Sequence, residues 1–510
     1  MVISDQAPGS RTLATDIVRF TRRSARQYRR SRISLADRFI DLYSWGLGLG
    51  VSLTIAAAFV LALRNEIAAR QDQADSIIRS AWFHLPEPFL WTSVTFVVLL
   101  AVSNLARKLG PLMVNGPEGA WWLPLPVDRG PMVLPPFLRH LALTAAAAII
   151  GYFPFSLVTS VDRSIAEHAL ATLTFGASAM IAVLLAAAQQ LGILPAWSGR
   201  AITALILAGL SVLPLASASG WPAAAGGMAA VVLLALVARR AGEVGGLELM
   251  RGGAVAGHAG ASLFLMDSNE VLRALNAGRK RPDGGRAAAF FARPTRTPFR
   301  ALVRADILAF LRLSPPLLPP VLWLGGVLAV LLVNGGLPVF VQLAVIVIAG
   351  CATASGMGTV ARKTAMIPEV DALLPLHPAL VRVSRMVMPC MVMALWTAVL
   401  ATFLVILGAA DAGLVLVGAL AGAAMGAGSL RAATRTQPDW TAPPVETPFG
   451  PVPRAQLGSL VRGLDVTILA MIPLLLALYL GAVPVTVMLV QGVFSAGIIA
   501  TVALSRPKQA

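Results

Sequence analysis

The chain has 510 residues, of which 57% are hydrophobic and only 13% are charged. A soluble protein of this length could not bury that much apolar surface, so the composition excludes an ordinary soluble protein and indicates a membrane protein. The formal net charge of +17 we attribute to membrane topology and contact with anionic lipids, and we expect no nucleic-acid partner. The two cysteines, Cys351 and Cys390, fall in apolar runs and predict neither a disulfide nor a metal pair.

The N-terminal segment 1–44 is polar and rich in arginine, and no apolar stretch typical of a signal peptide follows it. We predict a cytoplasmic basic segment that lies along the membrane interface. The next segment, 45–238, contains six apolar runs long enough to cross a bilayer. The predicted spans of this first membrane half are 45–63, 89–105, 141–158, 169–190, 201–220 and 223–238.

A long segment with few apolar runs, 239–316, follows the first half and is predicted to be a cytoplasmic linker. Within it, 265–277 has the pattern of a short amphipathic helix capped by Asp267 or Ser268, and 278–298 reads as a basic linker. Residues 299–316 carry apolar residues at helical spacing between arginines, typical of an interfacial helix. A functional role for this helix and a plain positive-inside anchor are both open.

The second membrane half is predicted at 317–505 and is followed by a cytoplasmic tail, 506–510. Its spans are 317–333, 339–355, 386–408, 414–430, 466–482 and 485–505. One of them carries glycines at every fourth position, which allow close helix–helix packing. These predicted helix-packing residues are Gly418, Gly422 and Gly426.

The fold class expected is an all-α integral membrane protein with about 12 transmembrane helices. With both termini in the cytoplasm, only four basic residues lie outside, namely Arg64, Arg70, Arg79 and Arg163. This bias follows the positive-inside rule and predicts the orientation. Arginine greatly outnumbers lysine, and Ala and Gly abound, which suggests a high-GC bacterial genome, so we expect the bacterial cytoplasmic (inner) membrane as the location. No Asp, Glu, Lys or Arg lies inside a predicted span, which argues against an ion-coupled transporter.

An internal duplication is indicated by sequence matches between the halves. The triplet Ala-Arg-Lys follows the second span at 106–108 and the eighth span at 361–363. Each triplet leads into a cytoplasmic stretch with a Leu-Pro turn, and 122–125 can be aligned with 373–376. Because each half has an even number of spans, we predict two six-helix repeats with the same orientation.

Motifs for catalysis are not found in this sequence. The histidines have no metal-ligand spacing, and we expect each to be a loop or interface residue. The nearest approach to a phosphate-binding loop, 356–364, has Met357 and Arg362 where glycines are required. We therefore expect no enzyme activity, no metal and no cofactor bound directly to this chain.

The arrangement resembles the transmembrane (permease) subunit of ABC-type exporters. Residues 123–129 (LPLPVDR) are similar to the cytoplasmic turn with which such permeases dock on their ATPase, and 374–378 (LPLHP) fit more loosely. The chain also resembles an actinobacterial family of polytopic membrane proteins of unassigned function, of which 447–453 (TPFGPVP) is a feature. The docking residues that the resemblance implies are Glu118, Trp121, Trp122, Leu123, Pro124, Asp128, Arg129, Glu369, Leu374, Pro375, His377, Arg382 and Arg385.

The function implied by this resemblance is the membrane-spanning component of an ATP-driven exporter, with ATP bound by separate ATPase subunits. The exported substrate is not readable from the sequence. A secondary transporter and a non-transporting membrane scaffold or assembly factor are the alternatives. The turn at 123–129 also has two interpretations, since it could dock on a partner or rest on the bilayer surface, where tryptophan is common.

Overall fold

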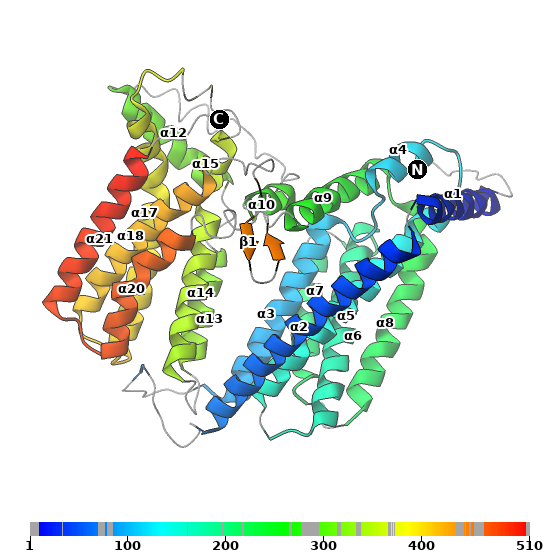
Figure 1. The fold of residues 1–510 in the computed structure, drawn as a ribbon, viewed down its shortest axis with the longest axis horizontal. Helices are drawn as coiled ribbons and strands as arrows, with labels where there is room; N and C mark the ends of the chain where they lie inside the picture. Colours follow the sequence, from blue (N-terminus) through cyan, green and yellow to red (C-terminus); the bar gives the residue numbers. More distant parts are fainter. Residues whose placement is uncertain are drawn as a thin grey trace. The chain divides into compact units, whose positions relative to one another are not determined.

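The computed structural model is predominantly helical in the residues that it describes. The described residues are 10–32, 34–69, 77–78, 85–160, 162–195, 198–216, 219–264, 268–276, 295–313, 318–332, 338–365, 369, 371, 373–434, 443, 445–447, 450–452 and 464–505. They form two compact units, coloured blue to green and green to red in Figure 1. One antiparallel pair, β1 (Val445–Thr447) and β2 (Gly450–Val452), includes part of the predicted TPFGPVP feature.

The first unit comprises Met1–Ala69, Pro88–Ala261 and Ala274–Gly278. Its elements are α1 (Ser10–Arg32), α2 (Leu35–Ala69), α3 (Glu87–Leu109), α4 (Gly116–Trp122), α5 (Gly130–Thr159), α6 (Ile165–Gln190), α7 (Ser198–Val212), α8 (Trp221–Arg240), the short 3₁₀ helix η1 (Ala241–Glu243) and α9 (Gly246–Phe264). Helix α6 is the most buried, because its many alanines let α5, α7 and α8 pack around it. Its start is fixed by a capping box in which Ser164 and Glu167 satisfy each other's backbone N–H.

The second unit comprises Arg70–Glu87, Ser262–Arg273 and Arg279–Ala510. Its helices are α12 (Pro298–Leu313), α13 (Leu318–Leu331), α14 (Val339–Met357), α15 (Thr359–Thr364), α17 (Pro378–Ile406), α18 (Gly413–Ala433), α20 (Leu464–Leu480) and α21 (Val485–Leu504). Helix α10 (Ser268–Asn276) crosses the division between the units. It corresponds to the predicted amphipathic helix, whereas Asp267, most of the basic linker and the tail lie outside the described residues.

Helix α18 is the centre of the second unit and packs against α14, α17, α20 and α21. A Cβ added to Gly422 would lie 2.3 Å from the backbone oxygen of Met393, and one added to Gly426 would lie 2.5 Å from Cys390 Cα. A Cβ added to Gly418 would be less crowded, at 3.0 Å from Ala401 Cβ. The backbones of α17 and α18 therefore approach each other along the three glycines that the sequence singles out.

Nine helices in the described part of the chain are long and apolar enough to cross a membrane. They are Leu42–Glu66, Pro88–Leu109, Gly130–Thr159, Ile165–Gln190, Trp221–Glu243, Val339–Met357, Pro378–Ile406, Gly413–Ala433 and Val485–Leu504, and three shorter apolar helices are Ser198–Val212, Pro319–Leu331 and Asp465–Leu480. Each of the predicted apolar runs overlaps one of these helices. Large apolar side chains such as Leu205 and Val493 point outward, with more than 70% of their surface exposed. The expectation of a helical membrane protein is confirmed.

Candidate functional site

The first candidate site is the turn between α4 and α5. The N–H of Leu125 donates to the carbonyl of Trp122 (3.1 Å), and the N–H of Val127 donates to the carbonyl of Leu125 (2.9 Å). Adjacent tryptophans point in opposite directions, because Trp122 is 8% exposed whereas Trp121 is 78% exposed. The turn thus has one anchored face and one exposed face.

The anchored face of this turn packs on α1. Trp122, Val127 and Met132 form a buried cluster with Ala14 and Val18 of α1. Ala14 and Val18 are one helical turn apart, so they present a single apolar face in an otherwise arginine-rich helix. Figure 1 shows α1 and α4 together at one end of α5. The basic N-terminal segment therefore braces the turn.

Polar contacts fix the start of α5. The Asp128 carboxylate accepts a hydrogen bond from the N–H of Gly130 (2.8 Å) and lies 3.8 Å from the Arg11 guanidinium. Arg129 donates to the carbonyl of Val244 (3.3 Å), beyond the end of α8. Both side chains are half-buried. The Asp-Arg pair thus has structural partners within its own unit.

The second candidate site, the turn before α17, repeats the same hydrogen-bond pattern. The N–H of Leu374 donates to the carbonyl of Asp371 (3.2 Å), and the N–H of Leu376 donates to the carbonyl of Leu374 (2.7 Å). His377 Nδ1 accepts from the N–H of Ala379 (3.3 Å), two residues on, as Asp128 does at α5. By its hydrogen bonds, Leu374-Pro375 therefore matches Leu125-Pro126. The alignment predicted from the sequence instead pairs it with Leu123-Pro124, two residues earlier.

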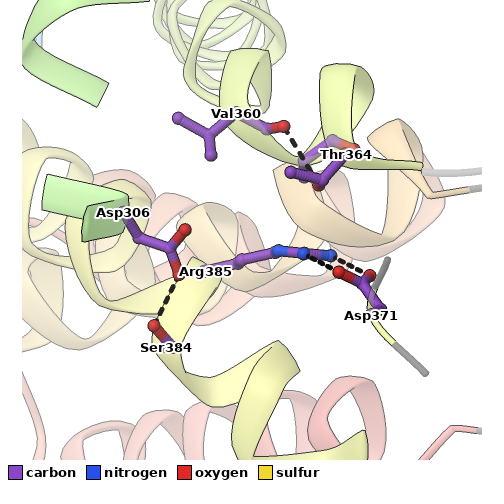
Figure 2. Close-up of polar contacts among 7 residues, drawn as sticks. Asp306, Val360, Thr364, Asp371, Ser384 and Arg385 are labelled. Atoms are coloured by element: carbon purple, nitrogen blue, oxygen red, sulfur yellow. Dashed lines mark hydrogen bonds and ion pairs between the residues drawn. The ribbon is translucent and has the colours of Figure 1, made fainter. Parts of the chain in front are cut away.

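The second turn is tied to α17 by an ion pair (Figure 2). Arg385 contacts both carboxylate oxygens of Asp371, with Nη1 2.6 Å from Oδ2. Its side chain is only 6% exposed, against 28% for Asp371. A two-pronged contact of this kind fixes direction as well as distance, so it holds the turn in one orientation on the helix.

A buried carboxylate on α12 lies beside this ion pair. Asp306 is 8% exposed and accepts a hydrogen bond of 2.5 Å from the hydroxyl of Ser384. Burial raises the pKa of Asp306 above its usual value, and the Ser384 hydrogen bond acts in the opposite direction. Helix α12 thereby packs on the start of α17, in the way that α1 packs on the start of α5. Asp306, Ser384 and Asp371 were not among the residues predicted from the sequence.

The predicted docking residues divide into two groups by exposure. The exposed group consists of Trp121, Pro124, Glu369, Pro375 and His377, and the half-buried or buried group consists of Glu118, Trp122, Leu123, Asp128, Arg129, Leu374, Arg382 and Arg385. Leu373, which directly precedes Leu374 in the second turn, is also exposed, with 83% of its surface accessible. An external protein could reach the first group, whereas the side chains of the second group are wholly or partly enclosed.

One histidine differs from the expectation of a loop or interface position. His168 lies in α6 and is completely buried, with Nδ1 2.9 Å from the hydroxyl of Ser156 on α5. The sequence carries no sign of this contact, because it depends on how the two helices pack. In the described residues, no group of three or more His, Cys, Asp and Glu side chains gathers at a metal-binding distance.

Comparison with known proteins adds the family. No curated protein and no solved structure matches the chain. A family model described as a family of unknown function, DUF6297, matches residues 86–443. This range holds both turns, the helices α5 and α17 that they precede, and the interfacial helix α12. The match covers more than half of the chain, and the protein therefore belongs to the DUF6297 family.

Proposed function

We propose that this protein is the membrane-spanning component of an ATP-driven exporter that works with separate ATPase subunits. The observation that carries the proposal is the repeated turn. At two places the chain forms the same hydrogen-bonded turn before a helix of about thirty residues, α5 with 30 and α17 with 29. The helix that follows each turn packs at its start on a helix that carries several arginines, α1 or α12. A pair of equivalent rigid turns is what a pair of ATPase subunits requires as attachment points.

The proposal includes twelve transmembrane helices in two parallel repeats. The order of helix lengths supports it. In each unit a long helix (α5 or α17) is followed by the most enclosed helix, α6 with 26 residues or α18 with 21, then by a shorter helix and a final helix of 20 residues. The shorter helices, α7 and α20, have 15 and 17 residues.

The proposed orientation places both turns in the cytoplasm of a bacterium, with the protein in its inner membrane. Its support is the distribution of Lys and Arg, which gather in the segments that this orientation puts inside. Both turns then lie on the side where ATP is available. ATP is bound by the partner, and this chain carries the motion and the substrate path.

The contact surface of each turn is small and stiff. Pro124 and Pro126 are exposed in the first turn, as Leu373 and Pro375 are in the second. Proline fixes the backbone angle, so little conformational entropy is lost when a partner binds. Trp121, just before the first turn, is 78% exposed, and tryptophan is one of the residue types that dominate binding energy.

The test is co-purification of the full-length chain in mild detergent, followed by mass spectrometry and an ATPase assay. The variants P124D/P126D and L373D/P375D place charges on the two turns and should each lower the yield of a co-purifying ATPase at least tenfold. The control variants I165D and V485D place the same charge on residues that are 75% and 70% exposed at the starts of α6 and α21. These controls should retain the ATPase.

Other outcomes would replace the proposal. Transport that stops when ion gradients are dissipated, while ATP is plentiful, would identify a secondary transporter. A stable partner that is not an ATPase, with no substrate flux in vesicles, would identify a scaffold or assembly factor. Equal loss of the ATPase in the turn variants and in the controls would remove the turns from the docking surface.

A further inference from the structure

A cavity of about 1030 Å³ lies in the first unit between α1, the α4 turn and the start of α5. Arginines reach it from two helices, Arg22 and Arg26 from α1 and Arg139 from α5. Trp121 and Glu118 line it from α4. The hydrogen bonds of the first turn are formed by its own backbone and by Asp128, and none of them involves the three arginines that line the cavity.

Helix α1 is anchored near its start, and the cavity lies beside the part of the helix that follows. Ala14 and Val18, near its start, are buried against Trp122. Arg22 and Arg26 follow at four-residue spacing on the same face and lie over the cavity. The packed residues thus place this face of α1 beside the start of α5, and the exposed side chains of Arg22 and Arg26 line the cavity.

The charge in the cavity is positive. In the described part of the chain, none of Arg22, Arg26 and Arg139 forms an ion pair with a carboxylate. Glu118 is the one acidic residue among the described residues that line the cavity. Burial raises its pKa, and the nearby Arg22 charge opposes the rise. Three arginines and one glutamate therefore line the cavity, which leaves an excess of positive charge for an anion, and the planar forks of arginine match phosphate oxygens.

The position of the cavity indicates that this anion is part of a lipid. Arg139 and His140 directly precede the apolar stretch of α5 that begins at Leu141. Trp121, 78% exposed, lies at the same rim. Tryptophan and arginine at the boundary of an apolar span mark the level of lipid headgroups, and basic pockets between helices on the cytoplasmic side bind phospholipid headgroups.

We propose that this cavity binds the phosphate headgroup of an anionic phospholipid, with Arg22, Arg26 and Arg139 as its ligands and Trp121 beside its acyl chains. The site would tie the basic helix α1 to the membrane and to the first turn at once. The proposal does not depend on the exporter function, because it concerns only the first unit and its lipid.

The experiment is a titration of the delipidated full-length protein in detergent, followed by native mass spectrometry. The probes are phosphatidylglycerol, phosphatidylcholine with the same acyl chains, and inorganic phosphate. We expect phosphatidylglycerol to bind more tightly than phosphatidylcholine, and phosphate to displace it only weakly. The variant R22Q/R26Q/R139Q should lower the affinity for phosphatidylglycerol on the order of 100-fold, as removal of three basic residues near an anionic lipid predicts.

A matched control removes three charges elsewhere in the same unit. R23Q/R239Q/R240Q changes exposed arginines that do not line the cavity, and its affinity should stay within about threefold of the unchanged protein. A second variant, A25W, places a large side chain in the cavity without altering charge and should also lose phosphatidylglycerol. It keeps the proposal testable if the triple variant fails to fold.

Four results would overturn the proposal. Equal binding of the two lipids would exclude headgroup recognition. Equal losses in both triple variants would show general surface attraction. Complete displacement by low millimolar phosphate would identify a site for a free anion. Retained lipid binding in R22Q/R26Q/R139Q together with loss of a co-purifying protein would identify the cavity as a protein contact.

Discussion

Asp128 and His377 make the same contact at equivalent positions in the two units. Each side chain accepts a hydrogen bond from the backbone N–H two residues on, at 2.8 Å for Asp128 and 3.3 Å for His377, and each does so at the start of a long helix. In sequence the second turn has lost the Asp-Arg pair of the first. In the structure the imidazole takes the place of the carboxylate, so the turn keeps its form although the residue type changes.

The first prediction concerns this cap. D128A removes a half-buried hydrogen-bond acceptor one residue before the N-cap of α5 and should destabilise the protein by about 1 kcal/mol, whereas H377A removes a longer, exposed N-cap contact and should cost less. H377D should match or exceed the stability of the unchanged protein, because a carboxylate is a better acceptor at a helix N-terminus. Thermal unfolding of the purified protein measures all three. D16A, at an exposed residue of α1, is the control and should change little; a larger loss for H377A than for D128A would contradict the prediction.

The second prediction concerns the Arg385–Asp371 ion pair. R385M leaves the Asp371 carboxylate half-buried without its partner and should destabilise the protein by about 3 kcal/mol, at the lower end for a buried pair. A double-mutant cycle with D371N should give a coupling energy of about 2 kcal/mol between the two side chains.

The control for this cycle is a more exposed pair in the same unit. Arg431 lies 3.2 Å from Asp465, and its side chain is 45% exposed. R431M with D465N should give a coupling energy below about 1 kcal/mol, because water screens exposed ion pairs. Equal coupling in the two cycles would show that burial of Arg385 does not strengthen its contact with Asp371.

Hydropathy predicts the membrane helices of this chain well, and the reason is physical. In lipid a backbone must form its hydrogen bonds within the helix, so a long apolar run has few alternatives to a helix. Every predicted apolar run overlaps an apolar helix of the structure, and the predicted interfacial segments at 1–44 and 299–316 overlap α1, α2 and α12. The glycine spacing in α18 also predicted the packing of this helix correctly, because close approach of two helices requires small residues.

The candidate sites were less predictable, because their contacts join residues far apart in sequence. Asp306 lies 78 residues before Ser384, and helical spacing alone suggests a polar surface position for it. The two turns match at an offset that differs by two residues from the apparent Leu-Pro alignment, since the backbone hydrogen bonds, and not the prolines, define the turn. The cavity under α1 likewise depends on which face of the helix packs, which the arginine-rich sequence does not reveal.

The third prediction concerns the contact of α17 and α18. G422A places a Cβ 2.1 Å from the Thr397 hydroxyl oxygen and 2.3 Å from the Met393 carbonyl. Backbone cannot move away cheaply, so this variant should lose roughly 3 kcal/mol or fail to accumulate. G492A, on α21, meets no atom within 4 Å and should be neutral or slightly stabilising. Expression level and thermal stability in detergent measure both; a neutral G422A would mean that the two helices are further apart than described.

The fourth prediction is a pH dependence caused by Asp306. Burial raises its pKa in the folded protein, so between its ordinary value of about 4 and the raised value the folded state binds more protons than the unfolded state. The free energy of unfolding must then fall as the pH rises through this window. D306N keeps an oxygen that can accept the hydrogen bond from Ser384, and it has no charge to bury. The thermal stability of this variant should therefore not decline as the pH rises through this window.

The measurement is the unfolding temperature of the unchanged protein and of D306N between pH 4 and pH 8. The two curves should lie close together at pH 4 and separate as the pH rises, with D306N the more stable. E369Q, at an exposed carboxylate of the second turn, should follow the unchanged protein throughout. Parallel curves for D306N and the unchanged protein would show that the Asp306 carboxyl ionises equally easily in the folded and unfolded states, and that α12 packs on α17 without a buried acid between them.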